Sequence, residues 1–174
     1  MEMIQHALAG HYGLIKFIHV FFVMTWAMSA VGAYVFYLRT AVYHAGKNPA
    51  DPVWQARRIW AFDQWDKTVW LEHAALPIIL VTGPLLFLSG GWSFQHHWLA
   101  WKLAIVILAF LPMEAVDIWV SHVRGPGVAM NREQSPEAWE SFRAMQLKFY
   151  RIVSPIVRFG IPFVIFLAVA KPSL

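Results

Sequence analysis

The chain has 174 residues, of which 59% are hydrophobic and 14% are charged. Average globular proteins have about 25% charged residues, so this composition excludes an ordinary water-soluble domain and indicates a membrane protein. Cysteine is absent, which excludes disulfides, iron–sulfur clusters and thiol catalysis. The net charge of +4 is not gathered in a separate basic domain, so nucleic-acid binding is not expected.

Four apolar runs of about 20 residues predict four transmembrane helices, because a helix of that length crosses about 30 Å of hydrocarbon. They lie at about residues 14–38, 69–88, 98–120 and 150–170. The predicted fold class is therefore all-α, an integral membrane bundle of four transmembrane helices. We expect a single membrane domain over residues 1–174, in contact with the lipid bilayer.

Basic residues are concentrated in two of the three loops between the runs. Five lie in the first loop and five in the third: Arg39, Lys47, Arg57, Arg58 and Lys67, then Arg124, Arg132, Arg143, Lys148 and Arg151. An excess of Lys and Arg is typical of cytoplasmic loops. The pattern predicts a multi-pass protein of the bacterial cytoplasmic membrane with both termini in the periplasm.

The first basic loop contains a helical pattern of its own. Asp51 is a candidate N-cap, and Pro52 can occupy the first helical position. Trp54, Phe62 and Trp65 then recur at helical spacing. We therefore expect an interfacial helix in this loop, with its tryptophan rings at the depth of the lipid headgroups.

The second basic loop restarts as a helix at Ser135-Pro136-Glu137. An apolar stripe of Ala138, Phe142, Met145 and Phe149 follows, and the pattern predicts that this helix continues into the fourth span. Prolines inside the spans predict bends, because each proline removes one backbone hydrogen bond.

Five ionisable side chains fall within the apolar runs and are the main candidates for function: His19, Lys102, Glu114, Asp117 and Arg158. An ionisable group in hydrocarbon costs several kcal/mol, so it is a functional candidate by default.

His19 lies about two turns inside the first span, on a face that continues through Phe22, Trp26 and Ala33. An imidazole at this depth suits a haem iron, which takes nitrogen ligands and an apolar surround. The alternative interpretation is a histidine hydrogen-bonded between helices. A second axial ligand would come from another span, and His97 and Lys102 are candidates.

Glu114 and Arg158 are predicted to lie at similar depths, roughly 10–12 Å inside their helices. Opposite charges at equal depth on neighbouring helices should pair, so one interpretation is a structural ion pair. In the other, Glu114 and Asp117 relay protons from the cytoplasm while Arg158 holds an anionic group of a ligand. The residue pattern leaves both interpretations open.

Four segments carry a resemblance to a known family: LIKFIH at Leu14–His19, FYLRTAVYHA at Phe36–Ala45, WKLAIVIL at Trp101–Leu108 and IPFVIFLAVAKP at Ile161–Pro172. In these segments the sequence resembles the HemJ-type protoporphyrinogen oxidases and their relatives in the CopD-like membrane family. It would be a divergent member, since Pro112, Met113 and Glu114 stand where a tyrosine–histidine pair is expected.

The resemblance implies a four-helix membrane fold, a bound haem b, and oxidation of protoporphyrinogen to protoporphyrin. It implies roles in cofactor or porphyrin binding for His19, Arg39 and Lys102. The first functional hypothesis is a haem b-binding membrane oxidoreductase that passes electrons to quinone or to a partner protein. The second is a non-catalytic accessory or assembly subunit, acting as a homo-oligomer or within a larger membrane complex.

Overall fold

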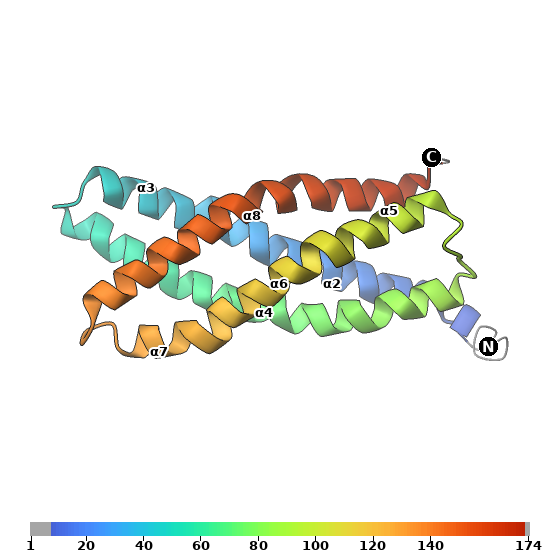
Figure 1. Cartoon of the computed structure of the whole chain (residues 1–174), viewed down its shortest axis with the longest axis horizontal. Coiled ribbons are helices and arrows are strands. Elements are labelled where there is room, and N and C mark those ends of the chain that lie inside the picture. The colour runs from blue at the N-terminus through green and yellow to red at the C-terminus, as the bar shows by residue number, and fades with distance from the viewer. Residues whose placement is uncertain (1–7, 173–174) are drawn as a thin grey trace. The chain divides into compact units, whose positions relative to one another are not determined.

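The computed structural model describes residues 8–172, except for the side chains of residues 30 and 31. Within that part of the chain the secondary structure is entirely helical, and short turns join the helices (Figure 1). Four of these helical stretches are long and apolar enough to cross a membrane. The predicted all-α class with four membrane-spanning helices is therefore confirmed.

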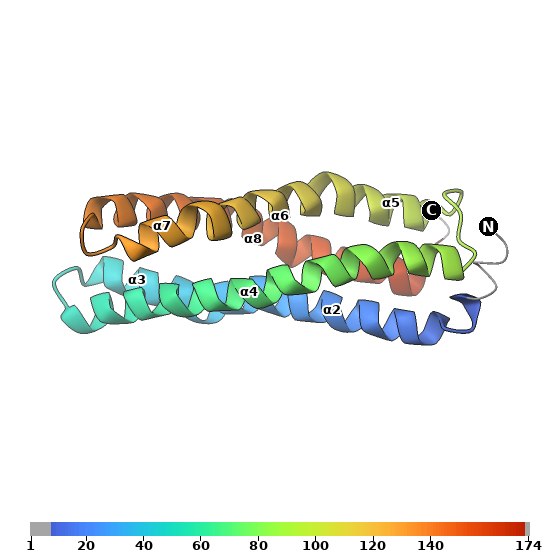
Figure 2. The ribbon, with the colours of Figure 1, turned by 90° about the horizontal axis from the view of Figure 1, so that it is seen from below.

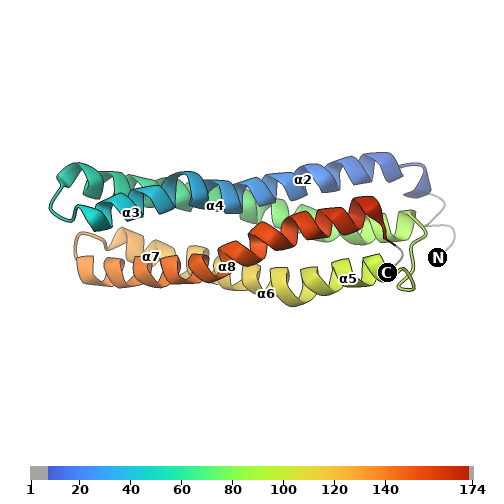
Figure 3. The same ribbon diagram turned by 90° about the horizontal axis from the view of Figure 1, so that it is seen from above.

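The chain predicted to form one domain divides into two compact units, which we describe separately as unit 1 (Met1–Ser93) and unit 2 (Phe94–Leu174). In unit 1, one long helical stretch packs against α4 (Pro52–Ser89), and the two run side by side (Figures 2 and 3). The first stretch consists of α2 (Tyr12–Ala33), the π-helical turn η1 (Tyr34–Leu38) and α3 (Arg39–Lys47).

Unit 2 is also a hairpin of two long helical stretches. Its second stretch is the single helix α8 (Pro136–Ala170), which packs against both ends of the first. The first consists of α5 (His97–Ile105), η2 (Val106–Phe110), α6 (Leu111–Ile118), η3 (Trp119–Arg124) and α7 (Gly125–Met130).

The four helical stretches are longer than the predicted spans. They contain 34 to 38 residues each, which is about 51–57 Å at 1.5 Å per residue and exceeds the roughly 30 Å of hydrocarbon. Only 12–22% of the residues in their most apolar windows are buried. The remaining apolar faces are suited to lipid, and the surplus length lies at the basic end of each hairpin.

Helix α4 begins after Asp51, as the sequence predicts, but it extends beyond the first basic loop in which the sequence predicts an interfacial helix. The Asp51 side chain accepts a hydrogen bond from the Val53 N–H at 2.9 Å, which caps the helix. The helix then continues to Ser89, so the predicted separate interfacial helix is wrong. The reason is that no glycine or proline interrupts residues 53–76, and Phe62 and Trp65 are buried instead of lying at a membrane surface.

Helix α8 confirms the prediction that the loop helix continues into the fourth span, because it runs unbroken from Pro136 to Ala170. Its buried face is rotated from the predicted apolar stripe. Ala138 is exposed, and Met145 and Phe149 are half-buried. The face that is buried carries Trp139, Phe142, Arg143, Gln146 and Tyr150.

Two π-helical turns flank α6 and were not apparent from the sequence. Pro112 lies in the first turn of α6, directly after η2. Proline lacks the N–H that would close a helical hydrogen bond, and a wider turn is one way for a helix to absorb that defect. The turns change which side chains of the first stretch point toward α8.

Gly160 of α8 allows close contact with Phe110 of η2. A Cβ atom at this position would lie 2.9 Å from Cζ of the Phe110 ring, which is itself buried. We expect Gly160→Ala to lower the free energy of unfolding by about 1–3 kcal/mol through overpacking. Thermal unfolding in detergent would measure this loss.

Two variants control that experiment. A Cβ at Gly127 meets nothing within 4 Å, so Gly127→Ala should leave the melting temperature of the protein nearly unchanged. Phe110→Leu combined with Gly160→Ala should recover part of the loss, because it shortens the clashing ring. Equal melting temperatures for Gly160→Ala and the wild type would contradict the contact.

Candidate functional site

His19 of α2 forms a hydrogen bond to a neighbouring helix. Its Nδ1 atom lies 2.8 Å from Oγ1 of Thr82 in α4. His19 is half-buried and Thr82 is buried. Each residue lies seven positions from a helix end, which is about 10 Å of helix, so the contact is well inside the apolar stretch. The hydrogen bond matches the interpretation of His19 as a histidine shared between helices.

Gly83 lies beside the His19 ring. A Cβ atom at Gly83 would lie 3.6 Å from Cε1 of His19, in ordinary van der Waals contact. The edge of the ring that includes Cε1 therefore faces a glycine instead of a bulky side chain. The room between Gly83 and this edge of the ring is about the size of a methyl group.

Arg39 cannot serve the same haem as His19. Both residues belong to one continuous helical stretch and are separated by 20 positions, which is about 30 Å along the helix. That distance is close to the full thickness of the hydrocarbon. A cation so far from the iron ligand cannot reach the propionates of a haem bound at His19, although Arg39 is exposed and open to other contacts.

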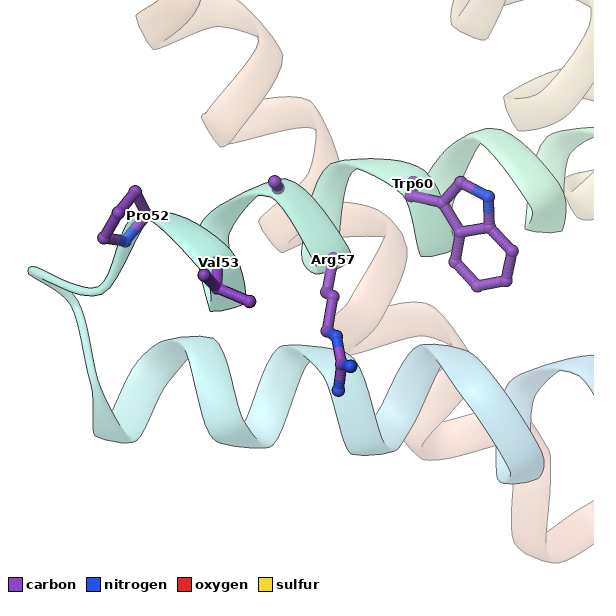
Figure 4. Close-up of a pocket in the computed structure, with 5 residues that line it drawn as sticks. Pro52, Val53, Arg57 and Trp60 are labelled. Carbon is purple, nitrogen blue, oxygen red and sulfur yellow. The ribbon is translucent and has the colours of Figure 1, made fainter.

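The basic end of unit 1 contains stacked aromatic side chains and a shallow groove. The His44 ring stacks on Trp54 at 4.4 Å between centroids, and the Arg57 guanidinium lies 5.0 Å from the centre of the same Trp54 ring. The groove, of about 480 Å³, is lined by the first turns of α4: Pro52, Val53, Ala56, Arg57 and Trp60 (Figure 4). Its lining contains one charged group and no acid or base for catalysis at neutral pH.

Unit 2 contains a buried chain of polar side chains between α6 and α8. The Tyr150 hydroxyl donates to Oδ1 of Asp117 at 2.7 Å, and Nη1 of Arg143 donates to Oε1 of Gln146 at 2.8 Å. Gln146 Nε2 lies 3.5 Å from the Tyr150 hydroxyl and links the two bonds. These four side chains are between 1% and 6% exposed.

The hydrogen bonds of this chain all point in one direction. Arginine has only donors, so it fixes Gln146 with its oxygen toward Arg143 and its amide nitrogen toward Tyr150. The phenol oxygen then accepts from Gln146, and its single hydrogen is directed to Asp117. The arrangement links the two helices through Arg143, Gln146 and Tyr150 of α8 and Asp117 of α6.

Glu114 and Arg158 do not form the ion pair that the sequence predicts. Glu114 is buried, whereas Arg158 is exposed and takes part in no ion pair within the described residues. Equal depth along two helices does not fix the direction in which side chains point. Val157, which is buried, occupies the inward face of α8, so its neighbour Arg158 is turned by about 100° away from it.

The other predicted site residues of unit 2 occupy different positions on its first helical stretch. Glu114 and Asp117 lie three positions apart on α6 and are both buried, as expected for residues on one helix face. His97 is exposed at the first position of α5, and Lys102 is half-buried in the same helix. Their predicted roles toward a cofactor remain predictions.

Three members of the polar chain escaped the sequence analysis. The sequence pattern marks Arg143 only as a loop cation and gives no separate signal for Gln146 or Tyr150. The spacing of 143, 146 and 150 is nevertheless that of one helix face. A search for polar residues at this spacing on a helix that enters a membrane would have found them.

Comparisons of the chain with protein-family profiles, curated proteins and solved structures found no match.

The contact between Tyr150 and Asp117 predicts coupled effects on stability. We expect Tyr150→Phe and Asp117→Asn each to lower the melting temperature, because the first removes the donor of a buried hydrogen bond worth about 1.5–3 kcal/mol and the second replaces its carboxylate acceptor by a weaker amide oxygen. The double variant should lose less than the sum of the single losses, with a coupling energy of about 0.5–3 kcal/mol.

Tyr43→Phe is the matched control, because the Tyr43 ring is 60% exposed and its change should leave the melting temperature almost unaltered. Strictly additive losses for Tyr150→Phe and Asp117→Asn would argue against the hydrogen bond.

Proposed function

We propose that this chain is a haem b-binding oxidoreductase of the bacterial cytoplasmic membrane, with His19 as an axial ligand of the iron. The proposal includes a periplasmic location for both termini and delivery of electrons to a quinone or a partner protein. A porphyrin-type substrate follows from the sequence resemblance. The observation that carries the proposal is an imidazole inside an apolar helix pair, held through Nδ1 and packed beside a glycine.

The residues around His19 fit a haem. Porphyrin supplies four nitrogen ligands itself, so the protein needs to add only one or two side chains. Nδ1 of His19 is engaged by a hydroxyl, which is the kind of outer contact that orients metal-bound histidines. Trp26, about 10 Å further along the same helical stretch, provides buried apolar surface. Bound haem would supply one-electron redox chemistry, and the protein would supply orientation and an apolar surround.

An absorption spectrum of the purified protein tests the proposal. We expect a Soret band and a sharp α band after reduction, and we expect His19→Ala to lose most of the bound haem. The control is His44→Ala, which removes the histidine stacked on Trp54 at the basic end of unit 1. Unchanged haem content in His19→Ala would exclude this ligand. Colourless wild-type protein at full yield would favour the accessory-subunit alternative.

Substitutions at Gly83 test whether the gap beside His19 is used. Gly83→Ala adds a Cβ at 3.6 Å from Cε1 of His19, a distance that the ring tolerates, so haem content should stay close to that of the wild type. Gly83→Leu adds three further carbons at the same place and should reduce haem content severalfold while the helical circular dichroism persists. Equal haem content in both variants would show that the ligand lies elsewhere.

A further inference from the structure

Thr82 has two kinds of hydrogen-bond partner. Its Oγ1 atom lies 2.6 Å from the carbonyl oxygen of Ile78 in the preceding turn of α4, and 2.8 Å from Nδ1 of His19. The carbonyl of Ile79 is more distant, at 3.4 Å. Thr82 is buried at 8% exposure, so these contacts form away from water.

The number of available hydrogens decides the direction of each bond. A threonine hydroxyl has one hydrogen, and a carbonyl oxygen can only accept. An oxygen–oxygen distance of 2.6 Å requires a hydrogen between the atoms, so the Thr82 hydroxyl donates to Ile78. The same hydroxyl must then accept from His19, which places a proton on Nδ1 and, in the neutral ring, leaves the lone pair on Nε2.

We propose that Thr82 is the positioning residue of the haem site, because it selects the Nδ1–H form of His19 and so presents Nε2 as the ligand atom. A hydroxyl that already donates to a carbonyl is a better acceptor. The Nδ1–H bond therefore strengthens the donation of Nε2 to a bound iron. The role of Thr82 toward iron rests on the proposed function, whereas the position of the proton on Nδ1 does not.

Nitrogen NMR of the full-length protein in lipid vesicles tests the proton position without haem. In protein labelled with ¹⁵N-histidine, we expect the His19 signal, identified by its absence in His19→Ala, to report a protonated Nδ1 and an unprotonated Nε2. Thr82→Val should shift that signal or broaden it over both forms, and Thr82→Ser, which keeps the hydroxyl, should retain it. A His19 signal unchanged in Thr82→Val would overturn the proposal.

Thr68→Val is the matched control for helix α4. The Thr68 hydroxyl donates to the Gln64 carbonyl at 2.8 Å, so the variant removes the same type of bond to the preceding turn. It leaves Thr82 in place. If Thr68→Val changed the His19 signal as much as Thr82→Val, the effect would come from the helix and not from the contact.

Haem-loaded protein gives the second readout. We expect Thr82→Val to weaken haem affinity about tenfold to a hundredfold, as for other outer-shell partners of a metal ligand, and to shift the reduction potential upward. Thr82→Ser should stay near the wild type. If the wild-type protein binds no haem, the proposed function and the role of Thr82 toward iron are both refuted. The NMR result would still decide which nitrogen of His19 carries the proton. Haem binding with a potential and affinity unaffected by Thr82→Val would refute only the role of Thr82.

Discussion

A polar side chain placed between apolar helices must find its partner inside the protein, because hydrocarbon offers no hydrogen bonds. Both units of this chain follow that constraint. In unit 1, His19 and Thr82 join the two helices of the hairpin. In unit 2, Tyr150 joins α8 to Asp117 of α6. Each bond crosses from one helix to the other, so each also restricts how the hairpin can slide or rotate.

The two polar groups differ in what they can do chemically. The His19 pair contains one titratable ring, which is held through Nδ1 by Thr82 and has Gly83 beside its Cε1 edge. The chain from Arg143 to Asp117 contains an amide that is held by an arginine and does not readily exchange protons. It therefore suits a fixed link between α6 and α8 better than long-range proton transfer.

The irregular turns of unit 2 are confined to its first helical stretch. Two π-helical turns lie on either side of α6, and each adds an extra residue to the local turn. Counting at 3.6 residues per turn therefore gives the wrong direction for residues beyond them. These turns do not account for the predicted pairing of Glu114 with Arg158, because Arg158 lies on the regular helix α8. That prediction matched depth alone, and it is Val157 that lies on the inward face of α8.

The sequence by itself determined the helical class, the four membrane-spanning stretches and the cap at Asp51, because these follow from apolar run length and local backbone chemistry. It also identified His19 and Asp117, since ionisable residues are rare in apolar runs. Only the tertiary structure decided that Thr82 binds His19 and that Tyr150 binds Asp117. Those partners are set by how each helix is rotated toward its neighbour, and rotation depends on packing contacts that are distant in the chain.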